Sequence, residues 1–391
     1  MGYDSRAGEG NRPARTDLPR LQTAPEKEIL RRIGKGPITF AEFMETALYW
    51  GDGGYYASSR EKWGGEGDYI TSIDVSPSFA RLLGKQVVEM WEALGTPGDF
   101  ALIEAGAGRG WLSKGVLQYL KASAPKLAGS IRIRLVDKNP RPERPPEGRV
   151  TWHRDLAEIK GPLKGVVVSN ELIDSFPVHV VEQRGGLKEV FVDFRDGSFK
   201  EVLLPPSTPA LEGYFKDLGI TLAEGQRAEV NLRAKDWIKK AGGLLSRGFV
   251  ITIDYGFPAK ELFSPERNGS LLCHFRHTLN DDPYINIGLQ DITSHVDFTT
   301  LVNSGKEAGL ELTGFTTQKN FLLGLGLEDE LHSVEKIDIE SFEMVARNRA
   351  IGMLIAPGGM GDTFKVLVQH KGVDKPALKG FSFKDMSRRL F

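Results

Sequence analysis

Short, continuous apolar runs recur along the chain and alternate with segments long enough to form helices. Five of these runs predict buried β-strands, at 100–104, 131–137, 150–153, 165–170 and 249–254. Late in the chain, 310–323 and 364–370 predict two more, and the weaker alternation of the second fits an antiparallel edge strand. Continuous apolar strands separated by helix-length segments indicate an α/β fold with a mostly parallel sheet covered on both faces.

Helical periodicity is clearest in the first third of the chain, at 28–33, 40–49, 76–94 and 111–123. Thr39 is placed as the N-cap of the second helix, and Pro77 stands at the start of the third, where proline is tolerated. The apolar face over 79–91 is interpreted as core, with a dimer seam as the alternative. Between the fourth and fifth strands, Asp196-Gly197 marks the turn of a predicted hairpin.

Composition and charge narrow the classes of function. Of 391 residues, 40% are hydrophobic and 26% are charged, which is typical of a globular protein. Lys and Arg number 51 against 52 Asp and Glu, and this net charge of -1 argues against a generally basic nucleic-acid binder. The single cysteine, Cys273, excludes an internal disulfide and a multi-cysteine zinc site, and it indicates a reducing compartment. No run of 18 apolar residues occurs, so we expect no membrane span and a cytoplasmic location.

A glycine loop follows the first predicted strand directly. Glu104 ends the strand, and Gly106, Gly108 and Gly110 alternate after it. Glycines allow a sharp turn and a close ligand approach. A dinucleotide-binding fingerprint would need a third glycine where Trp111 stands, so the spacing suits S-adenosylmethionine better than NAD or FAD. The alternative is an ordinary strand-to-helix turn.

The next two strands end on further acids. Asp137 is placed to accept both ribose hydroxyls of a nucleoside, with a simple turn aspartate before Asn139 as the alternative. Asp155 is placed at the adenine amino group and Leu156 against the ring. An N-cap for the following helix is the alternative for Asp155.

The segment 170–177 ends the fourth strand, where a transferable methyl group would lie. Asn170 is assigned to the cofactor, and Glu171, followed by Asp174, is the favoured catalytic carboxylate. A carboxylate can orient a guanidinium or an amine and stabilise the positive charge of the product. The alternative is a helix N-terminus that favours acids through its dipole.

Three further residues are candidates for the substrate pocket. Tyr255 ends the fifth strand, and a buried structural tyrosine is an equal alternative. His274 belongs to a small basic cluster that suits a solvated or substrate-facing edge. His295 stands four residues after Asp291, on the same face if the segment is helical, while Asp297 is expected to cap the helix that follows. No metal site is expected, because methyl transfer from a sulfonium needs none.

Taken together, these residues resemble the MidA/NDUFAF-seven-like family of class I S-adenosylmethionine-dependent methyltransferases. The resemblance covers about 26–371. It is carried by five stretches in order, Gly53-Gly54-Tyr55-Tyr56 with 67–72, then 104–110, 169–177, Ile253-Asp254-Tyr255-Gly256 and 290–298. The order of all five, and the last stretch, are the specific features, since a glycine loop alone is common.

The resemblance implies a doubly wound, seven-stranded class I methyltransferase fold with an N-terminal helical extension and an inserted α+β subdomain. The expected division is a disordered tail at 1–25, the helical extension at 26–98, a cofactor-binding core at 99–184, the inserted subdomain at 185–245, the remaining core at 246–375 and a C-terminal tail at 376–391.

By the same resemblance, Thr71 and Ser72 help to close the cofactor pocket, and a protein arginine is the substrate class. The chain departs from the family where Ile73-Asp74 replaces the usual Pro-Glu, which puts a role for that acid in doubt. Eukaryotic relatives are mitochondrial. A protein substrate is expected, with no nucleic acid or membrane partner, and a homodimer is one option. Methylation of a small molecule, or a cofactor-binding assembly factor, are the alternatives.

Overall fold

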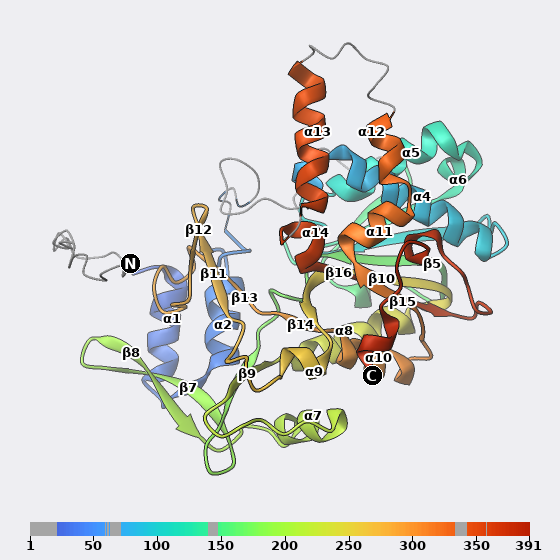
Figure 1. Cartoon of the computed structure of the whole chain (residues 1–391). Coiled ribbons are helices and arrows are strands. Elements are labelled where there is room, and N and C mark those ends of the chain that lie inside the picture. The colour runs from blue at the N-terminus through green and yellow to red at the C-terminus, as the bar shows by residue number, and fades with distance from the viewer. Residues whose placement is uncertain are drawn as a thin grey trace, which may run out of the picture.

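The centre of this computed structural model is an eight-stranded sheet (Figure 1). The structure describes residues 22–58, 60, 62, 72–139, 148–332, 342–356 and 358–391. Within them, the sheet follows the order β15-β16-β10-β5-β2-β3-β4, and β14 pairs with the end of β10. The strands are β2 Phe100–Ala105, β3 Arg132–Val136, β4 Val150–His153, β5 Leu163–Asn170, β10 Leu245–Phe257, β14 Val296–Asp297, β15 Glu311–Thr317 and β16 Phe364–Lys371.

The apolar runs predicted this sheet well. The five early strands lie where they were expected, and neighbours in the set β4-β3-β2-β5-β10 are parallel. β16 is antiparallel to both β10 and β15, as its pattern suggested. It is not an edge strand, however, because it lies between those two and is buried along nearly all its length. The strand predicted at 310–323 is also shorter than expected, since Thr317 caps a helix that begins at Gln318.

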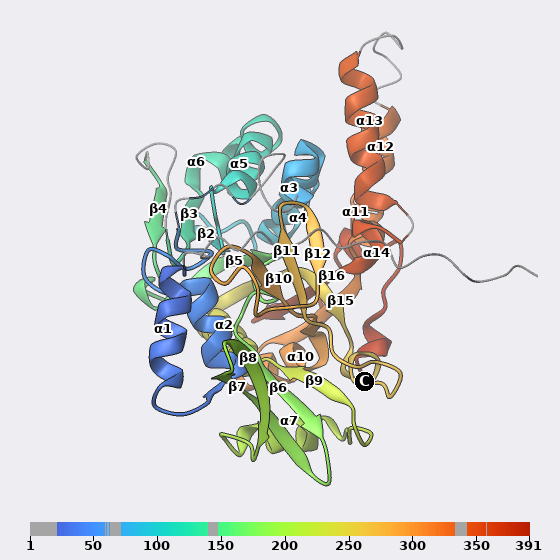
Figure 2. The same cartoon turned by 90° about the vertical axis from the view of Figure 1, so that its left-hand side faces the viewer.

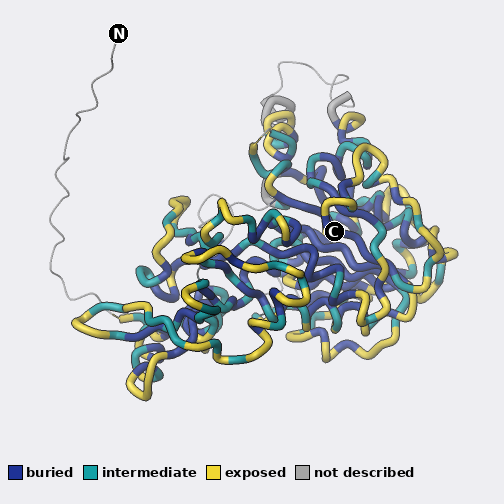
Figure 3. Tube along the Cα trace, turned by 60° about the horizontal axis from the view of Figure 1, so that its bottom comes forward, coloured by how far each residue is buried: buried dark blue, intermediate teal, exposed yellow. Residues whose placement is uncertain are grey.

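Helices cover both faces of the sheet, as predicted. On one face, α4 (Pro77–Ala93), α5 (Trp111–Ser123) and α11 (Gln318–Gly324) pack against alternate strand residues such as Leu102. On the other face, α8 (Leu232–Gly243) and α10 (Phe298–Glu307) pack against the intervening residues such as Ile103. The apolar face of α4 is therefore core. Figure 3 shows the buried part of the trace concentrated along the central strands.

Apart from two N-terminal helices given below, the other described helices are short or lie outside these two layers. They are α3 Ser72–Val75, α6 Pro125–Ser130, α7 Ala210–Leu218, α9 Ala259–Leu262, α12 Leu327–His332, α13 Phe342–Ile355, α14 Met360–Thr363 and the 3-10 turns η1 Leu156–Glu158, η2 Lys379–Phe381 and η3 Ser387–Leu390. Near the C-terminus, Met386 and Leu390 are buried, and Met386 N donates to Phe315 O at 2.7 Å, so this segment packs beside β15. Among the described helices, none combines the length and apolar character needed to cross a membrane.

A second sheet lies beside the first and is assembled from distant stretches (Figures 1 and 2). Its strands are β1 Ile38–Thr39, β6 His179–Gln183, β7 Leu187–Arg195, β8 Ser198–Leu204 and β9 Arg227–Val230. β7 and β8 form the predicted hairpin, with positive φ at both Asp196 and Gly197. A small third sheet contains β11 Leu272–Phe275, β12 Thr278–Asn280 and β13 Asp291–Thr293.

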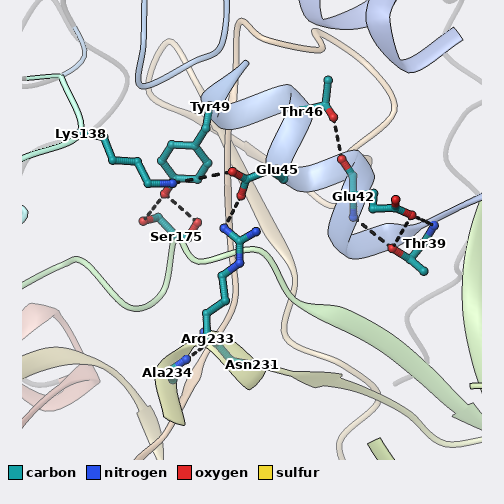
Figure 4. Close-up of polar contacts among 10 residues, drawn as sticks. All are labelled: Thr39, Glu42, Glu45, Thr46, Tyr49, Lys138, Ser175, Asn231, Arg233 and Ala234. Carbon is teal, nitrogen blue, oxygen red and sulfur yellow. Dashed lines mark hydrogen bonds and ion pairs between the residues drawn. The ribbon is translucent and has the colours of Figure 1, made fainter. Parts of the chain in front are cut away.

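Two N-terminal helices, α1 (Ala24–Ile33) and α2 (Phe40–Tyr49), pack on the second sheet. The predicted N-cap of α2 is confirmed. Thr39 Oγ1 accepts from Glu42 N at 3.2 Å, while Glu42 Oε2 accepts from Thr39 N at 2.9 Å (Figure 4). This capping box satisfies two backbone donors at the start of the helix. The cap also bears on the site described below, because α2 ends at Tyr49, whose hydroxyl donates to Ser175 in the segment after β5.

Thr39→Ala should therefore lower the free energy of unfolding by about 0.5–2 kcal/mol, through loss of the cap. Urea unfolding measures the change. The matched control is Thr221→Ala, which alters an exposed loop threonine and should leave stability within about 0.5 kcal/mol of wild type. Equal effects of the two substitutions would contradict the role given to the cap.

Candidate active site

A cavity of about 770 Å³ opens where the carboxyl ends of β2, β3 and β5 meet. This is the edge at which open parallel sheets bind ligands. Most of the residues predicted for the site contribute to its wall. The wall comprises Tyr49, Gly51, Asp52, Tyr56, Ala57, Ile73, Glu104, Ala105, Gly106, Ala107, Gly108, Arg109, Trp111, Val136, Asp137, Lys138, Asn139, Arg154, Asp155, Leu156, Asn170, Glu171, Leu172, Ser175, Phe176, Pro177, Arg233, Asp236, Trp237 and Lys240.

The glycine loop needs its glycines for conformation and for space. Gly106, Gly108 and Gly110 have φ angles of 74°, 51° and 73°, a region that side chains disfavour. A Cβ on Gly106 would lie 2.9 Å from Leu172 Cδ1. Gly106 and Gly108 line the cavity, whereas the space beside Gly110 is filled by Leu135 at 2.9 Å. Gly110 therefore serves the packing of the loop.

Asp137 lies at the end of β3 and faces this loop. Its Oδ2 accepts from Gly108 N at 2.9 Å, and its Oδ1 accepts from Asn139 N at 2.9 Å. The turn geometry considered as an alternative is thus present, yet the carboxylate also lines the cavity. A carboxylate oxygen accepts more than one hydrogen bond, so this arrangement suits the hydroxyl pair of a ribose.

The wall beyond β4 has a capped aspartate beside an apolar residue. Asp155 Oδ1 accepts from Ala157 N at 2.8 Å and caps η1, so the N-cap interpretation holds. Both Asp155 and Leu156 still line the cavity. Trp237, on α8, belongs to the same apolar cluster as Leu156. This part of the wall therefore combines apolar side chains with one carboxylate.

Glu104 is buried at the start of the glycine loop. Its Oε2 accepts from Ser113 N at 3.0 Å. Burial raises the pKa of Glu104 to about 7, against the opposing effect of the Ser113 hydrogen bonds. A carboxyl group in this position changes its charge near neutral pH.

Glu171 lies in the wall with a strained backbone. Its φ is 52°, which is uncommon for a residue with a Cβ and is typical of functional positions. Glu171 Oε1 accepts from Asn170 Nδ2 at 3.0 Å and from Ser72 N at 3.3 Å. Ser72, at the start of α3, therefore contacts the site through its backbone, while its hydroxyl donates to Gln318 Oε1 at 3.0 Å.

Helix α2 reaches the cavity from the second sheet (Figure 4). Tyr49, its last residue, donates to Ser175 O at 3.0 Å, and the Lys138 ammonium lies 3.9 Å from the centre of its ring. Glu45, one turn earlier, pairs with Lys138 at 3.7 Å and with Arg233 of α8. Helix α2 therefore connects three parts of the cavity wall. These are the segment after β3, the segment after β5 and helix α8.

Several wall residues were not predicted. Tyr49 was assigned only to a helix, and Arg233, Asp236, Trp237 and Lys240 were assigned to none of the site roles. The four α8 residues follow the i, i+3, i+4, i+7 spacing of one helix face. This spacing was the only feature of the sequence that could have placed them together. Tyr56 was named only within a stretch that carries the family resemblance, and it lines the cavity with its hydroxyl donating to Asp291 at 2.9 Å.

Other predicted residues lie away from the described wall. Asp174 is buried, which raises its pKa to about 6, and an interaction with Tyr255 opposes that rise. His274 lies in β11 opposite Asp291, and burial lowers the pKa of His295 to about 4 beside the Tyr255 and Phe257 rings. Asp291 and His295 do not share a helix face, because Asp291 begins a strand. Asp297 does cap α10. Thr71 lies outside the described residues.

The sheet order, the glycine loop and the acids at the carboxyl edge define a class I S-adenosylmethionine-dependent methyltransferase. A family model described as "Putative S-adenosyl-L-methionine-dependent methyltransferase" matches residues 82–316, and the chain belongs to that family. The residues fit the cofactor, since Gly106 and Gly108 place backbone without side chains in the cavity wall and the Asp137 carboxylate lines the same cavity.

Relatives align over nearly the whole chain. A crystal structure from Burkholderia thailandensis, of a protein bound to S-adenosyl-homocysteine, is 30% identical with a TM-score of 0.81, and the match covers 93% of this chain and 96% of that one. The mitochondrial protein arginine methyltransferase NDUFAF7 of Homo sapiens is 28% identical over 93% of this chain and 86% of its own length. The Drosophila melanogaster homologue is 28% identical over 90% and 86%.

Gly108→Val should abolish cofactor binding, because it places a branched side chain in the cavity wall at a φ of 51°. Calorimetry with S-adenosylmethionine should show an affinity loss of about 100-fold or more, about 2.7 kcal/mol. Gly98→Val is the matched control, since a Cβ there meets nothing within 4 Å. Unchanged affinity in Gly108→Val would remove the loop from the cofactor site.

Glu104 should also make stability depend on pH. A carboxyl group whose folded pKa is about 7, against 4.5 in its ordinary state, holds more protons when folded than when unfolded. Its contribution to stability is complete below pH 4.5 and is lost as the pH rises through 7. Relative to Glu104→Gln, the wild type should lose roughly 2 kcal/mol of unfolding free energy between pH 5 and 8. Urea unfolding of both proteins across this pH range measures the difference. The same dependence of unfolding free energy on pH in both proteins would refute the prediction.

Proposed function

We propose that this methyltransferase transfers the methyl group to a guanidinium nitrogen of an arginine in a protein. The observation that carries the proposal is the Glu171 carboxylate, which lines the cavity at the end of β5 and is held there by Asn170 and Ser72. The names of the aligned eukaryotic relatives support the same substrate class.

The chemistry needs a correctly placed acceptor more than a strong base. The bound cofactor supplies an electrophilic methyl group on a sulfonium. A carboxylate binds a guanidinium with charge-assisted, often paired hydrogen bonds, which fixes the plane of the group and aims one nitrogen. Holding the acceptor in line in this way removes much of the entropy cost of the transfer. Glu171 also stabilises the added positive charge that the attacking nitrogen carries until its proton leaves.

The N-terminal extension contributes the outer part of the acceptor path in this proposal. Tyr49 and Tyr56 stack with ring centres 5.4 Å apart and both line the cavity. Ser72 closes the inner end next to Glu171. A protein partner and a cytoplasmic location remain predictions.

The direct test is incubation of the protein with labelled S-adenosylmethionine and a cell extract, followed by mass spectrometry of labelled products. Label on arginine is the expected result. Label on a metabolite would instead support small-molecule methylation. Complex formation with a protein but no transfer would support an assembly factor that uses the cofactor only for binding.

Glu171→Gln should lower kcat by about 100-fold or more while cofactor affinity stays within about threefold, since the glutamine keeps the shape but not the charge. Timed methyl-transfer assays measure kcat, and calorimetry measures the affinity for the cofactor. Glu212→Gln, on the exposed surface of α7, is the control and should match wild type in both. If Glu171→Gln loses cofactor affinity and keeps kcat, Glu171 is a cofactor ligand instead.

A further inference from the structure

The buried carboxylate of Asp254 has no role in the site described so far. It lies near the end of β10, the strand that pairs with β5 on the side away from β2. Asp254 is fully buried, with 0% exposure. A buried carboxylate needs several hydrogen bonds in place of those it made to water, so the donors around Asp254 indicate its structural role.

Asp254 accepts from the backbone of the turn that carries Glu171. Its Oδ2 receives Ile173 N at 2.9 Å, Leu172 N at 3.3 Å and Asp174 N at 3.4 Å. Its Oδ1 receives Tyr255 N at 3.0 Å. Three successive N–H groups thus converge on one oxygen, which fixes the direction of the chain immediately after Glu171.

The preceding residue of β10 binds the same turn through its backbone, since Glu171 N donates to Ile253 O at 2.9 Å. The following residue, Tyr255, acts on Asp174 in the turn, and its interaction opposes the rise that burial causes in the pKa of Asp174. Ile253 and Asp254 of one strand therefore bind the turn at two successive levels.

This anchoring accounts for the unusual backbone of Glu171. A left-handed φ of 52° is unfavourable for a residue with a Cβ and persists only where surrounding contacts enforce it. The carboxylates of Glu171, Asp174 and Asp254 also repel one another, and burial together with the Asp174 charge raises the pKa of Asp254 well above its ordinary value. Placing a third acid here is unfavourable unless it does something that an apolar residue cannot do.

We infer that Asp254, assisted by Tyr255, is a positioning residue that holds the 171–174 turn so that the Glu171 carboxylate faces the acceptor. The inference rests on the proposed function of Glu171. It assigns no contact between Asp254 and either the cofactor or the acceptor, since the described cavity wall does not include Asp254.

Asp254→Asn is a sharp probe because it changes hydrogen bonding with little change in shape. Both carboxylate oxygens face N–H donors, so either orientation of an amide turns an NH₂ group against a donor. Hydrogen exchange followed by mass spectrometry should show exchange at 172–174 faster by about tenfold or more. This measurement needs no acceptor.

Asp297→Asn is the matched control. Asp297 is likewise buried, and its Oδ1 accepts from Thr299 N at 2.9 Å and Thr300 N at 3.2 Å at the start of α10. Its Oδ2 meets only the hydroxyls of Tyr214 and Thr300, which can accept from an amide, and asparagine caps a helix as well as aspartate does. The substitution should therefore leave exchange at 172–174 unchanged and change exchange at 299–300 little. Unchanged exchange at 172–174 in Asp254→Asn would overturn the inference.

The dependence of kcat on Glu171 distinguishes a positioning role from a general loss of stability. With an arginine acceptor identified by the labelling experiment, Asp254→Asn should lower kcat by about tenfold or more, with cofactor affinity within about threefold of wild type. In a Glu171→Gln background, the same change should lower kcat by less than about twofold, because Asp254 acts through Glu171. The same fold loss in both backgrounds would overturn the inference.

The two proposals fail in different ways. If no arginine acceptor is found, the proposed function fails, while the exchange data still decide whether Asp254 fixes the turn. Should Asp254→Asn not fold, Tyr255→Phe removes only the hydroxyl that interacts with Asp174. It should then raise exchange at 174 and lower kcat severalfold, and the absence of both effects would overturn the inference.

Discussion

Backbone N–H groups donating to carboxylates at the ends of parallel strands are the interaction on which the site depends. Glu104 receives Ser113 N, Asp137 receives Gly108 N and Asn139 N, and Asp254 receives three donors from the turn after β5. Each contact ties a loop to the strand beneath or beside it. The loops are thereby kept apart, and the space between them remains open for a ligand instead of collapsing into core.

The second sheet and α2 contribute what the central sheet cannot. A seven-strand order with a glycine loop specifies where a nucleoside would lie, but it leaves the acceptor side open to solvent. Here Tyr49, Glu45 and their partners carry α2 across that side and join it to α8. The chemistry of the site is thus shared between a sheet that places the cofactor and an extension that shapes access to it.

Much of the fold followed from the sequence because it depends on local pattern. Continuous apolar runs located the strands, and the glycine loop and Asp137 were found because each follows a strand directly. What could not be predicted depends on long-range pairing. The local sequence of Phe364–Lys371 does not show that this strand lies between two others. Likewise, only the packing of α2 in the folded protein shows that Tyr49 contacts the segment after β5. The role of Tyr255 was left open because the function of a buried tyrosine depends on the residues around it, and its neighbour Asp174 comes from another part of the chain.

The pairing of Ile38 with Val192 has a consequence for how the molecule forms. Helix α2, which borders the cavity, follows β1 directly, yet β7, the strand that pairs with β1, is made only after the glycine loop, Asp137 and the 170–177 segment. Contacts so far apart in sequence form slowly. During synthesis, the glycine loop therefore emerges well before α2 has a surface to rest on, and a nascent chain passes through a period with an exposed, half-built cleft.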